Sequence, residues 1–178
     1  RINVSLDTLR SDRFLAVTPR NDLPAVIEGL KIAKEVGLAP IKINSVVIKG
    51  FNEDEILELV EFGRVNGFEM RFIEFLDVGN ANSWTLKRTV QKKQILETIN
   101  SRYPIEEVHR GDVNSPSVDY RYLDGLGRVG IIGSLTEPFC SDCTRARLTA
   151  DGHLVTCLFS ENGIDLKVGL RGGMTDAE

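Results

Sequence analysis

Three strand-like segments alternate with two helix-like segments over the first 75 residues, and this alternation constrains the fold of the 178-residue chain most strongly. In the first segment, apolar Ile2, Val4 and Leu6 alternate with polar residues, as in a strand with one buried face. A spacing of about thirty residues between strands is typical of right-handed βαβ units, so we expect a parallel sheet. The expected strands are residues 1–7, 40–48 and 69–75, and the expected helices are 22–36 and 52–67.

Cap residues mark the ends of these helices. Asn52 is expected to be the N-cap of the second helix, with the Glu55 side chain reaching back to complete a capping box. Gly67 is expected to end that helix. A further capping-box pattern at residues 175–178 has no helical sequence after it, and residue 1 already lies in a strand pattern. We therefore expect the chain to be a segment of a longer one.

Polar side chains interrupt the predicted parallel strands. Strands covered by helices on both faces are apolar throughout, whereas Lys42 and Asn44 share a face of the second strand and Arg71 interrupts the third. A sheet curled into a barrel accounts for this, because polar residues can then face a lumen that holds a ligand. The alternative is an open sheet with Lys42 and Arg71 at its edges, bridged to carboxylates. The residues expected to face helices are Ile2, Val4, Leu6, Ile41, Ile43, Met70 and Phe72.

The pattern changes after Phe75. A Gly/Asn-rich loop at residues 79–84 leads to a predicted helix at about 89–101. Alternating runs near 117–123 and 128–132 then flank turn residues, which indicates an antiparallel hairpin. We predict an α/β fold in two regions. Residues 1–80 form the last parallel strands of a partial (β/α) barrel, and residues 81–178 form a small α+β unit with antiparallel hairpins that carries the cysteines.

All three cysteines, Cys140, Cys143 and Cys157, lie within this second region. A disulfide framework uses cysteines in pairs, whereas a metal centre can leave one coordination position open. The first two have the spacing of a metal knuckle, and a hairpin of residues 144–150 and 153–158 would return Cys157 to them. A turn with a bulge at Gly152 would place Cys157 across from Arg145, whereas a two-residue turn would separate them. We expect the bulged register, in which Thr149 pairs with His153.

Cysteine spacing alone favours zinc and an iron–sulfur cluster about equally. Zinc would need a fourth ligand from His153, Asp142 or a segment outside the chain. A four-iron cluster on three thiolates would have one iron without a protein ligand. Arg145 and Arg147 are two residues apart in the predicted strand, so both could bind one anion. Without the cysteines, surface salt bridges would be the more common role for two such arginines.

The composition indicates which kinds of partner the chain is not expected to bind. The net charge of −4 gives no overall basic field, so nucleic acid is not expected as a ligand. No apolar run is long enough to span a bilayer, and the first residues do not have a signal-peptide pattern. We expect a cytoplasmic protein without membrane contact, whose thiols are reduced and available as ligands.

Residues 138–159, with the three cysteines and the two arginines, closely resemble the C-terminal cluster segment of the GTP 3′,8-cyclase family. These are radical S-adenosylmethionine (radical SAM) enzymes, and they begin molybdenum cofactor (molybdopterin) biosynthesis. Residues 3–7, 41–46 and 70–75 are similar to the fourth, fifth and sixth barrel strands of that family. The resemblance covers essentially the whole chain and implies that it is the C-terminal two-thirds of such an enzyme. Residues 1–80 would then be the second half of a radical-SAM-type (β/α) barrel, and residues 81–178 the C-terminal region that holds the auxiliary cluster and the substrate. The activity implied is that of a lyase that converts GTP to 3′,8-cyclo-7,8-dihydro-GTP through a 5′-deoxyadenosyl radical formed at a first [4Fe–4S] cluster.

The resemblance also implies the site residues. Lys42 and Arg71 would reach the GTP triphosphate from the barrel lumen, and Ser5 would contact S-adenosylmethionine. Leu76 would make a second contact to S-adenosylmethionine at a position where many relatives carry methionine. The residues lining the GTP site would be Arg145, Ala146 and Arg147. The ligands of an auxiliary [4Fe–4S] cluster, whose open iron accepts guanine, would be Cys140, Cys143 and Cys157.

The chain also lacks a motif that the family requires. A radical SAM enzyme needs a Cys-x3-Cys-x2-Cys loop, and these 178 residues do not contain one. The first cluster would therefore be bound outside this segment, which we expect to be inactive alone and to hold no catalytic side chain. The partners implied are GTP, a second copy in a homodimer, and the downstream cyclic pyranopterin monophosphate synthase. The alternatives are a radical SAM peptide-maturation enzyme with an auxiliary cluster and a non-catalytic zinc- or cluster-stabilised nucleotide-binding module.

Overall fold

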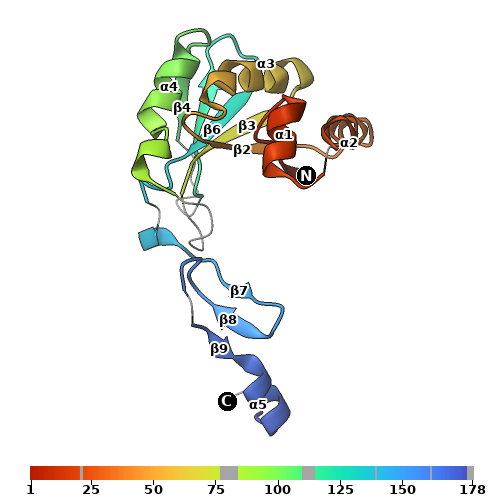
Figure 1. Ribbon diagram of the computed structural model, residues 1–178, viewed down its shortest axis with the longest axis vertical. Helices are drawn as coiled ribbons and strands as arrows, with labels where there is room; N and C mark the ends of the chain where they lie inside the picture. The colour runs from red at the N-terminus through yellow and green to blue at the C-terminus, as the bar shows by residue number, and fades with distance from the viewer. Residues whose placement is uncertain (21, 77–83, 110–114, 139, 161, 176–178) are drawn as a thin grey trace.

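The computed structural model describes residues 1–20, 22–76, 84–109, 115–138, 140–160 and 162–175. A sheet covered by helices forms one part, and a C-terminal segment extends away from it (Figure 1). The strands are β1 (Ile2–Ser5), β2 (Ile41–Val47), β3 (Glu69–Glu74), β4 (Ile105–Val108), β5 (Val118–Tyr122), β6 (Arg128–Ile132), β7 (Arg147–Leu148), β8 (His153–Val155) and β9 (Ile164–Asp165). The α-helices are α1 (Ser11–Val17), α2 (Leu23–Glu35), α3 (Ile56–Asn66), α4 (Lys92–Asn100) and α5 (Leu166–Gly172).

The larger sheet has the strand order β1-β2-β3-β6-β5-β4. Strands β1, β2, β3 and β6 are parallel, whereas β4, β5 and β6 pair in antiparallel fashion. The predicted βαβ alternation and the hairpin between β5 and β6 are therefore confirmed. The hairpin extends the same sheet, because β6 pairs directly with β3. In the described residues this sheet is open, with β1 and β4 at its edges, and closure into a barrel stays a prediction.

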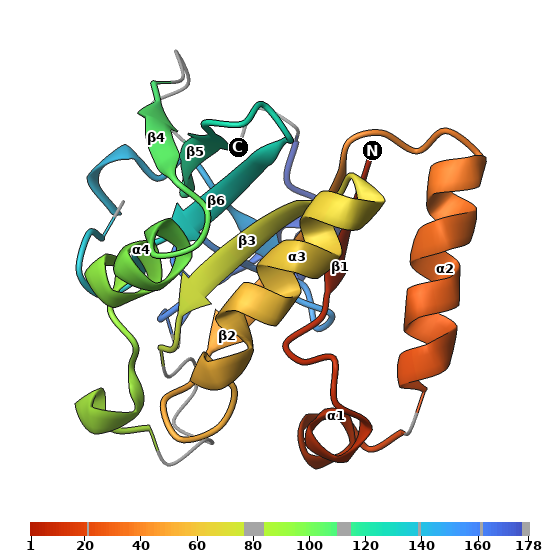
Figure 2. The same ribbon diagram turned by 90° about the horizontal axis from the view of Figure 1, so that it is seen from above.

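The two faces of this sheet differ in polarity. Helices α2, α3 and α4 contact the strands, and α3 lies across the sheet in Figure 2. The strand residues in the core beneath these helices include Ile43, Met70, Phe72, Val129 and Ile131, all at most 1% exposed. Burial of this apolar surface drives the packing of helices on sheet.

The opposite face carries the polar residues. Lys42 pairs in register with Glu69 there, and Asn44 with Arg71. Strands β2 and β3 are interior strands, so the alternative that places Lys42 and Arg71 at the edges of an open sheet is wrong. Lys42 Nζ does approach the Glu69 carboxylate, at 3.2 Å. A parallel strand can carry such residues here because helices α2, α3 and α4 pack on the other face.

The expected capping box at the second helix is wrong. The Asn52 side chain caps no helix. Its Oδ1 accepts from Ile48 N, and its Nδ2 donates to the carbonyls of Asp7 and Val46. The Glu55 carboxylate is buried and accepts from Thr8 Oγ1 at 2.8 Å. Both residues join the loop after β1 to the loop after β2, and this tertiary use overrides the local cap pattern.

Several elements have no counterpart in the predictions. Helix α1, strands β4 and β9, and helix α5 are two to seven residues long and too short to show a clear period in the sequence. Residues 79–83 of the Gly/Asn-rich loop and residues 176–178 of the C-terminal capping-box pattern lie outside the described residues. Across the part of the chain that is described, every helix is too short or too polar to span a bilayer.

The C-terminal segment is a small three-stranded sheet, β7-β8-β9, followed by α5. Arg147 pairs with Val155 and Leu148 with Leu154, and Thr149 N donates to the His153 carbonyl at 2.9 Å. Gly152 has φ +83°, in the left-handed region that a bulged turn needs. The register thus agrees with the bulged turn, although the paired strands are shorter than the expected 144–150 and 153–158.

Candidate functional site

A cavity of about 580 Å³ lies where the sheet meets the C-terminal segment. Val46, Ile73 and Ile132 form part of its apolar wall, from the ends of β2, β3 and β6. The carboxyl ends of parallel strands meet at one edge of a sheet, and this is the edge at which α/β proteins place their ligands. The fold therefore puts the cavity at a position suited to binding.

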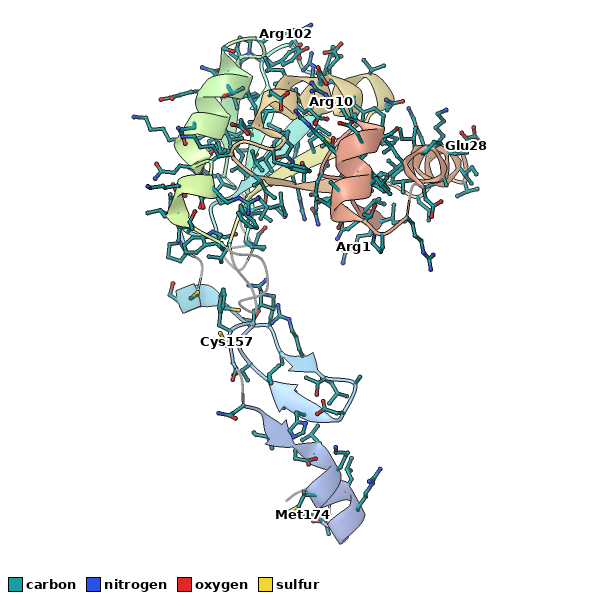
Figure 3. The ribbon with its side chains drawn as sticks, viewed as in Figure 1. Arg1, Arg10, Glu28, Arg102, Cys157 and Met174 are labelled. Atoms are coloured by element: carbon teal, nitrogen blue, oxygen red, sulfur yellow. The ribbon has the colours of Figure 1, made fainter. Side chains whose placement is uncertain are left out.

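All three cysteines line this cavity. Cys140 begins the short 3-10 helix η3 (Cys140–Asp142), and Cys143 N donates to the Cys140 carbonyl at 3.3 Å, so the two thiols follow one tight turn. Cys157 comes from the chain after β8 and lies near the junction of the two parts in Figure 3. All three thiols are free and exposed to solvent.

This donor set suits a soft metal centre in its chemistry, because reduced and accessible thiols are the ligands of iron–sulfur clusters and of zinc. The geometry is less complete. Among the side chains that are described, no three Cys, His, Asp or Glu groups converge closely enough to hold one metal ion. The cysteines therefore share a cavity without the spacing of a loaded site.

Arg145 and Arg147 line the same cavity. Arg145 Nε donates to the Cys143 sulfur at 3.4 Å. The pKa of the Cys143 thiol is lowered by hydrogen bonds from the backbone and side chain of Arg145, with a smaller effect of the Arg147 charge. The thiolate, the form that binds metals, is thus favoured at Cys143.

His153 belongs to a different group. Its Nδ1 lies 3.0 Å from Asp151 Oδ2, and the Thr149 hydroxyl bonds the same carboxylate. These residues line a neighbouring cavity of about 400 Å³ on the hairpin, which reaches Cys157 but neither Cys140 nor Cys143. The side chain thus has a local role in the turn, and the fold does not bring it to the first two thiols.

Lys42 and Arg71 do not line the cysteine-lined cavity. They lie on the polar face of the sheet, in the same strands as Val46 and Ile73 and on the same side of each. Lys42 is four residues before Val46, or about 13 Å along the strand. Arg71 is two residues before Ile73, or about 7 Å. The face thus changes from apolar at the cavity to basic farther along the strands.

The remaining expected site residues are Leu76, Ser5 and Ala146, and one of them lines the cavity. Leu76 lines the cysteine-lined cavity, just beyond β3. Ser5 ends the edge strand β1, exposed and in register with Asn44 on the polar face. Ala146 is exposed between the two arginines and does not line the cavity.

Glu74 is a cavity residue that the sequence analysis did not identify. It ends β3, is 1% exposed, and accepts four hydrogen bonds from residues of two loops. Burial disfavours its charge, but the hydrogen bonds from Thr136, Lys92 and Leu135 outweigh burial and lower its pKa. The period of two could have identified Glu74, because this charged residue follows Met70 and Phe72 on the buried face of the strand.

Fold and site together define a mixed α/β protein with thiols and guanidinium groups at the carboxyl edge of a parallel sheet. Residues 68–178 match the family model described as Molybdenum Cofactor Synthesis C, and residues 1–63 match that of the Radical SAM superfamily. The chain belongs to the molybdenum cofactor synthesis C family.

Curated relatives agree with this assignment. Over 174 residues the chain is 45% identical to "GTP 3',8-cyclase 3" of Mycobacterium bovis, covering 97% of this chain and 46% of the relative. Over 176 residues it is 44% identical to "GTP 3',8-cyclase 1" of Mycobacterium tuberculosis, covering 98% and 48%. Over 174 residues it is 42% identical to the "GTP 3',8-cyclase" of Xanthomonas axonopodis pv. citri, covering 97% and 52%. The chain spans about half the length of these relatives.

Proposed function

We propose that these residues form part of a GTP 3′,8-cyclase, about half of its length, and supply its auxiliary cluster site and its GTP site. The main support is the shared cavity, which brings three cysteines and two arginines to the carboxyl ends of β2, β3 and β6. Relatives with that name match nearly the whole chain. The enzyme would act in the cytoplasm, and its product would be a precursor for cyclic pyranopterin monophosphate synthase.

Cys140, Cys143 and Cys157 would hold the auxiliary [4Fe–4S] cluster. When bound, the cluster would supply an iron without a protein ligand, where the guanine base could attach. Small movements of the hairpin would have to bring the thiols together, because they line the cavity without converging. Arg145 would favour the thiolate of Cys143 through the hydrogen bond already present.

GTP would lie with its base in the cavity and its phosphates along the polar face of the sheet. The apolar side chains of Val46, Ile73 and Ile132 suit a purine, whereas Arg71 and Lys42 lie about 7 and 13 Å farther along the strands. Arg147 and Arg145 would bind GTP from the hairpin, beside Ala146. One guanidinium group can bind two phosphate oxygens at once. The arginines on the hairpin and Arg71 on the sheet therefore both favour an anion.

S-adenosylmethionine would contact Ser5 and Leu76, and a second [4Fe–4S] cluster would be held by residues outside this chain. The chain contains three cysteines, and the proposal assigns all of them to the auxiliary site. The isolated 178 residues would therefore bind one cluster and GTP weakly, without turnover.

Anaerobic metal analysis tests this proposal. After reconstitution with iron and sulfide, the 178-residue chain should hold about four irons and four sulfides, with none bound after Cys157→Ser. Tightly bound zinc in their place would identify a zinc-stabilised nucleotide-binding module. Turnover of GTP by the isolated chain would contradict the assignment of the first cluster to residues outside it.

A further inference from the structure

We propose that Glu74 is a positioning residue, which fixes the turn before Cys140 and so places the first cysteines in the cavity. The proposal deepens the function proposed above and rests on it for the role of the cysteines. Its own basis is a set of contacts between β3, the start of α4 and residues 133–138.

The Glu74 carboxylate is saturated by donors from two loops. Oε1 accepts from Lys92 N at 2.6 Å and from Thr136 Oγ1 at 2.6 Å. Oε2 accepts from Leu135 N at 2.8 Å and from Thr136 N at 2.9 Å. With four donors within 3 Å, this buried side chain has no capacity left for solvent. It therefore ties the loop after β6 to the loop after β3.

A charged carboxylate suits this position better than a neutral group. Lys92 is the first residue of α4, whose N-terminal amides carry partial positive charge. Three of the four donors are backbone amides, which would need another acceptor if the carboxylate were removed. Glutamine would keep one carbonyl oxygen but turn an amide group toward donors.

A second contact closes the same turn. The Lys92 side chain, only 9% exposed, donates to Glu137 Oε2 at 2.5 Å. Glu137 N in turn donates to the Gly133 carbonyl at 3.0 Å. Thus α4 holds both flanks of the turn, through Lys92 N on Glu74 and Lys92 Nζ on Glu137. The turn itself, residues 133–137, ends three residues before Cys140.

This arrangement explains how a poorly buried site keeps its place. Pro138 and Ser134 line the same cavity as Glu74 and the cysteines, so the clamped turn forms part of the cavity wall. Cys140 itself is exposed to solvent, so burial contributes little to fixing its position. The clamp at Glu74 supplies the fixed point from which η3 starts.

The experiment compares Glu74→Gln with Glu55→Gln in the complete protein that contains these residues. Glu55 is a matched control, because it is a fully buried carboxylate with hydrogen bonds from Thr8, Leu9 and Arg13. These partners of Glu55 are in the loop after β1 and in α1, far in the sequence from the cysteines. Under anaerobic reconstitution, Glu74→Gln should lose about half of the iron, corresponding to one of two four-iron clusters, whereas Glu55→Gln should keep all of it. The electron paramagnetic resonance signal that responds to added GTP should disappear in Glu74→Gln only.

A milder pair of variants covers the case in which Glu74→Gln does not fold. Thr136→Val removes one of the four donors, and Thr136→Ser keeps the hydroxyl, so the first should lower cluster occupancy and the second should restore it. Equal iron and an equal GTP response in wild type, Glu74→Gln and Thr136→Val would overturn the proposal. Equal losses in Glu74→Gln and Glu55→Gln would also overturn it, because the effect would then follow general destabilisation.

Hydrogen exchange of the metal-free protein separates this proposal from the proposed function. Glu74→Gln should raise exchange in peptides covering 133–138 and the start of α4 at least tenfold, with β5 unchanged. If the wild type binds no cluster at its cysteines, the proposed function fails, and this exchange result still decides whether Glu74 holds the turn. Unchanged exchange at 133–138 would overturn the clamp.

Discussion

The six-stranded sheet and the C-terminal segment have opposite properties. All the core residues lie in the part before residue 132, whereas none of the described residues from 140 to 175 is buried. Large apolar side chains of the C-terminal segment are instead exposed, with Leu170 at 77% and Val168 at 71%. Yet the cysteines and the two arginines belong to this segment. The stable part of the molecule thus supplies the location of the site, and the weakly packed part supplies its reactive groups.

Truncation of a core residue should show the contrast most strongly. Phe72→Ala, at a site that is 0% exposed, should lower the free energy of unfolding by about 3–5 kcal/mol, because it leaves a cavity under α3. Leu170→Ala should change it by less than about 0.5 kcal/mol. Urea unfolding of the complete protein measures both. A loss well above 1 kcal/mol for Leu170→Ala would show that other parts of the protein cover the C-terminal segment, which would break the contrast.

Loss of the Glu74 contacts between the two parts should have the second-largest effect on stability. Glu74→Gln should cost about 2–4 kcal/mol of unfolding free energy, since it removes a charged acceptor from buried donors. The pKa of Glu74 is lowered from its ordinary value of 4.5. A carboxyl with a lowered folded pKa stabilises the fold above its unfolded pKa, and this contribution is lost as pH falls through the folded pKa.

The wild type should therefore lose stability below about pH 4.5 more steeply than Glu74→Gln. Thermal unfolding followed between pH 3 and 7 would show the two stability curves converging in acid. Parallel curves over that range would mean that Glu74 does not carry the acid dependence. The Glu55→Gln variant serves as the comparison, because its carboxylate lies in a separate network.

The third prediction concerns ligand binding at the weakly packed part. Arg147→Ala should weaken GTP binding by about 1.5–3 kcal/mol, because one or more charge-assisted hydrogen bonds are lost. Arg102→Ala is the control, because that side chain is exposed after α4, stacks on Tyr103 and does not line the cysteine-lined cavity. Calorimetric titration of the reconstituted protein measures both. An unchanged affinity for Arg147→Ala would mean that this arginine does not contribute to GTP binding.

The comparison also shows which features a sequence reveals. The period of two in residues 1–7 predicts β1, and Asp151-Gly152 predicts the turn between β7 and β8, because both depend on neighbours in the chain. Asn52 and Glu55 instead bind partners more than forty residues away, at Asp7 and Thr8, so their local cap pattern misleads. The Glu74 clamp depends on contacts to a turn about sixty residues later, which no local pattern encodes.

Some features of the site could likewise be predicted from the sequence, and others could not. Clustering of cysteines and arginines in residues 140–157 predicted that they share one site, and the shared cavity agrees with this. The hydrogen bond from Arg145 to Cys143 was not predicted, because side-chain direction depends on the irregular backbone between η3 and β7. The roles of Ser5, Lys42 and Arg71 stay predictions, because these residues lie on the polar face away from the cavity.

The smallest expected effect is at the hairpin turn. Gly152 has φ +83°, and a Cβ there would approach the Lys167 side chain to 2.9 Å. Gly152→Ala should therefore cost about 1–2 kcal/mol locally, from the left-handed backbone and the displaced lysine. Because the C-terminal segment shares little core with the sheet, this cost should raise hydrogen exchange at Thr149 and Leu166, whose turn contacts flank Gly152, without shifting the main unfolding transition. Ala150→Gly, an exposed position in the same turn, is the control for altered chain entropy. A shift of the main transition in Gly152→Ala would show instead that the two parts unfold as one cooperative unit.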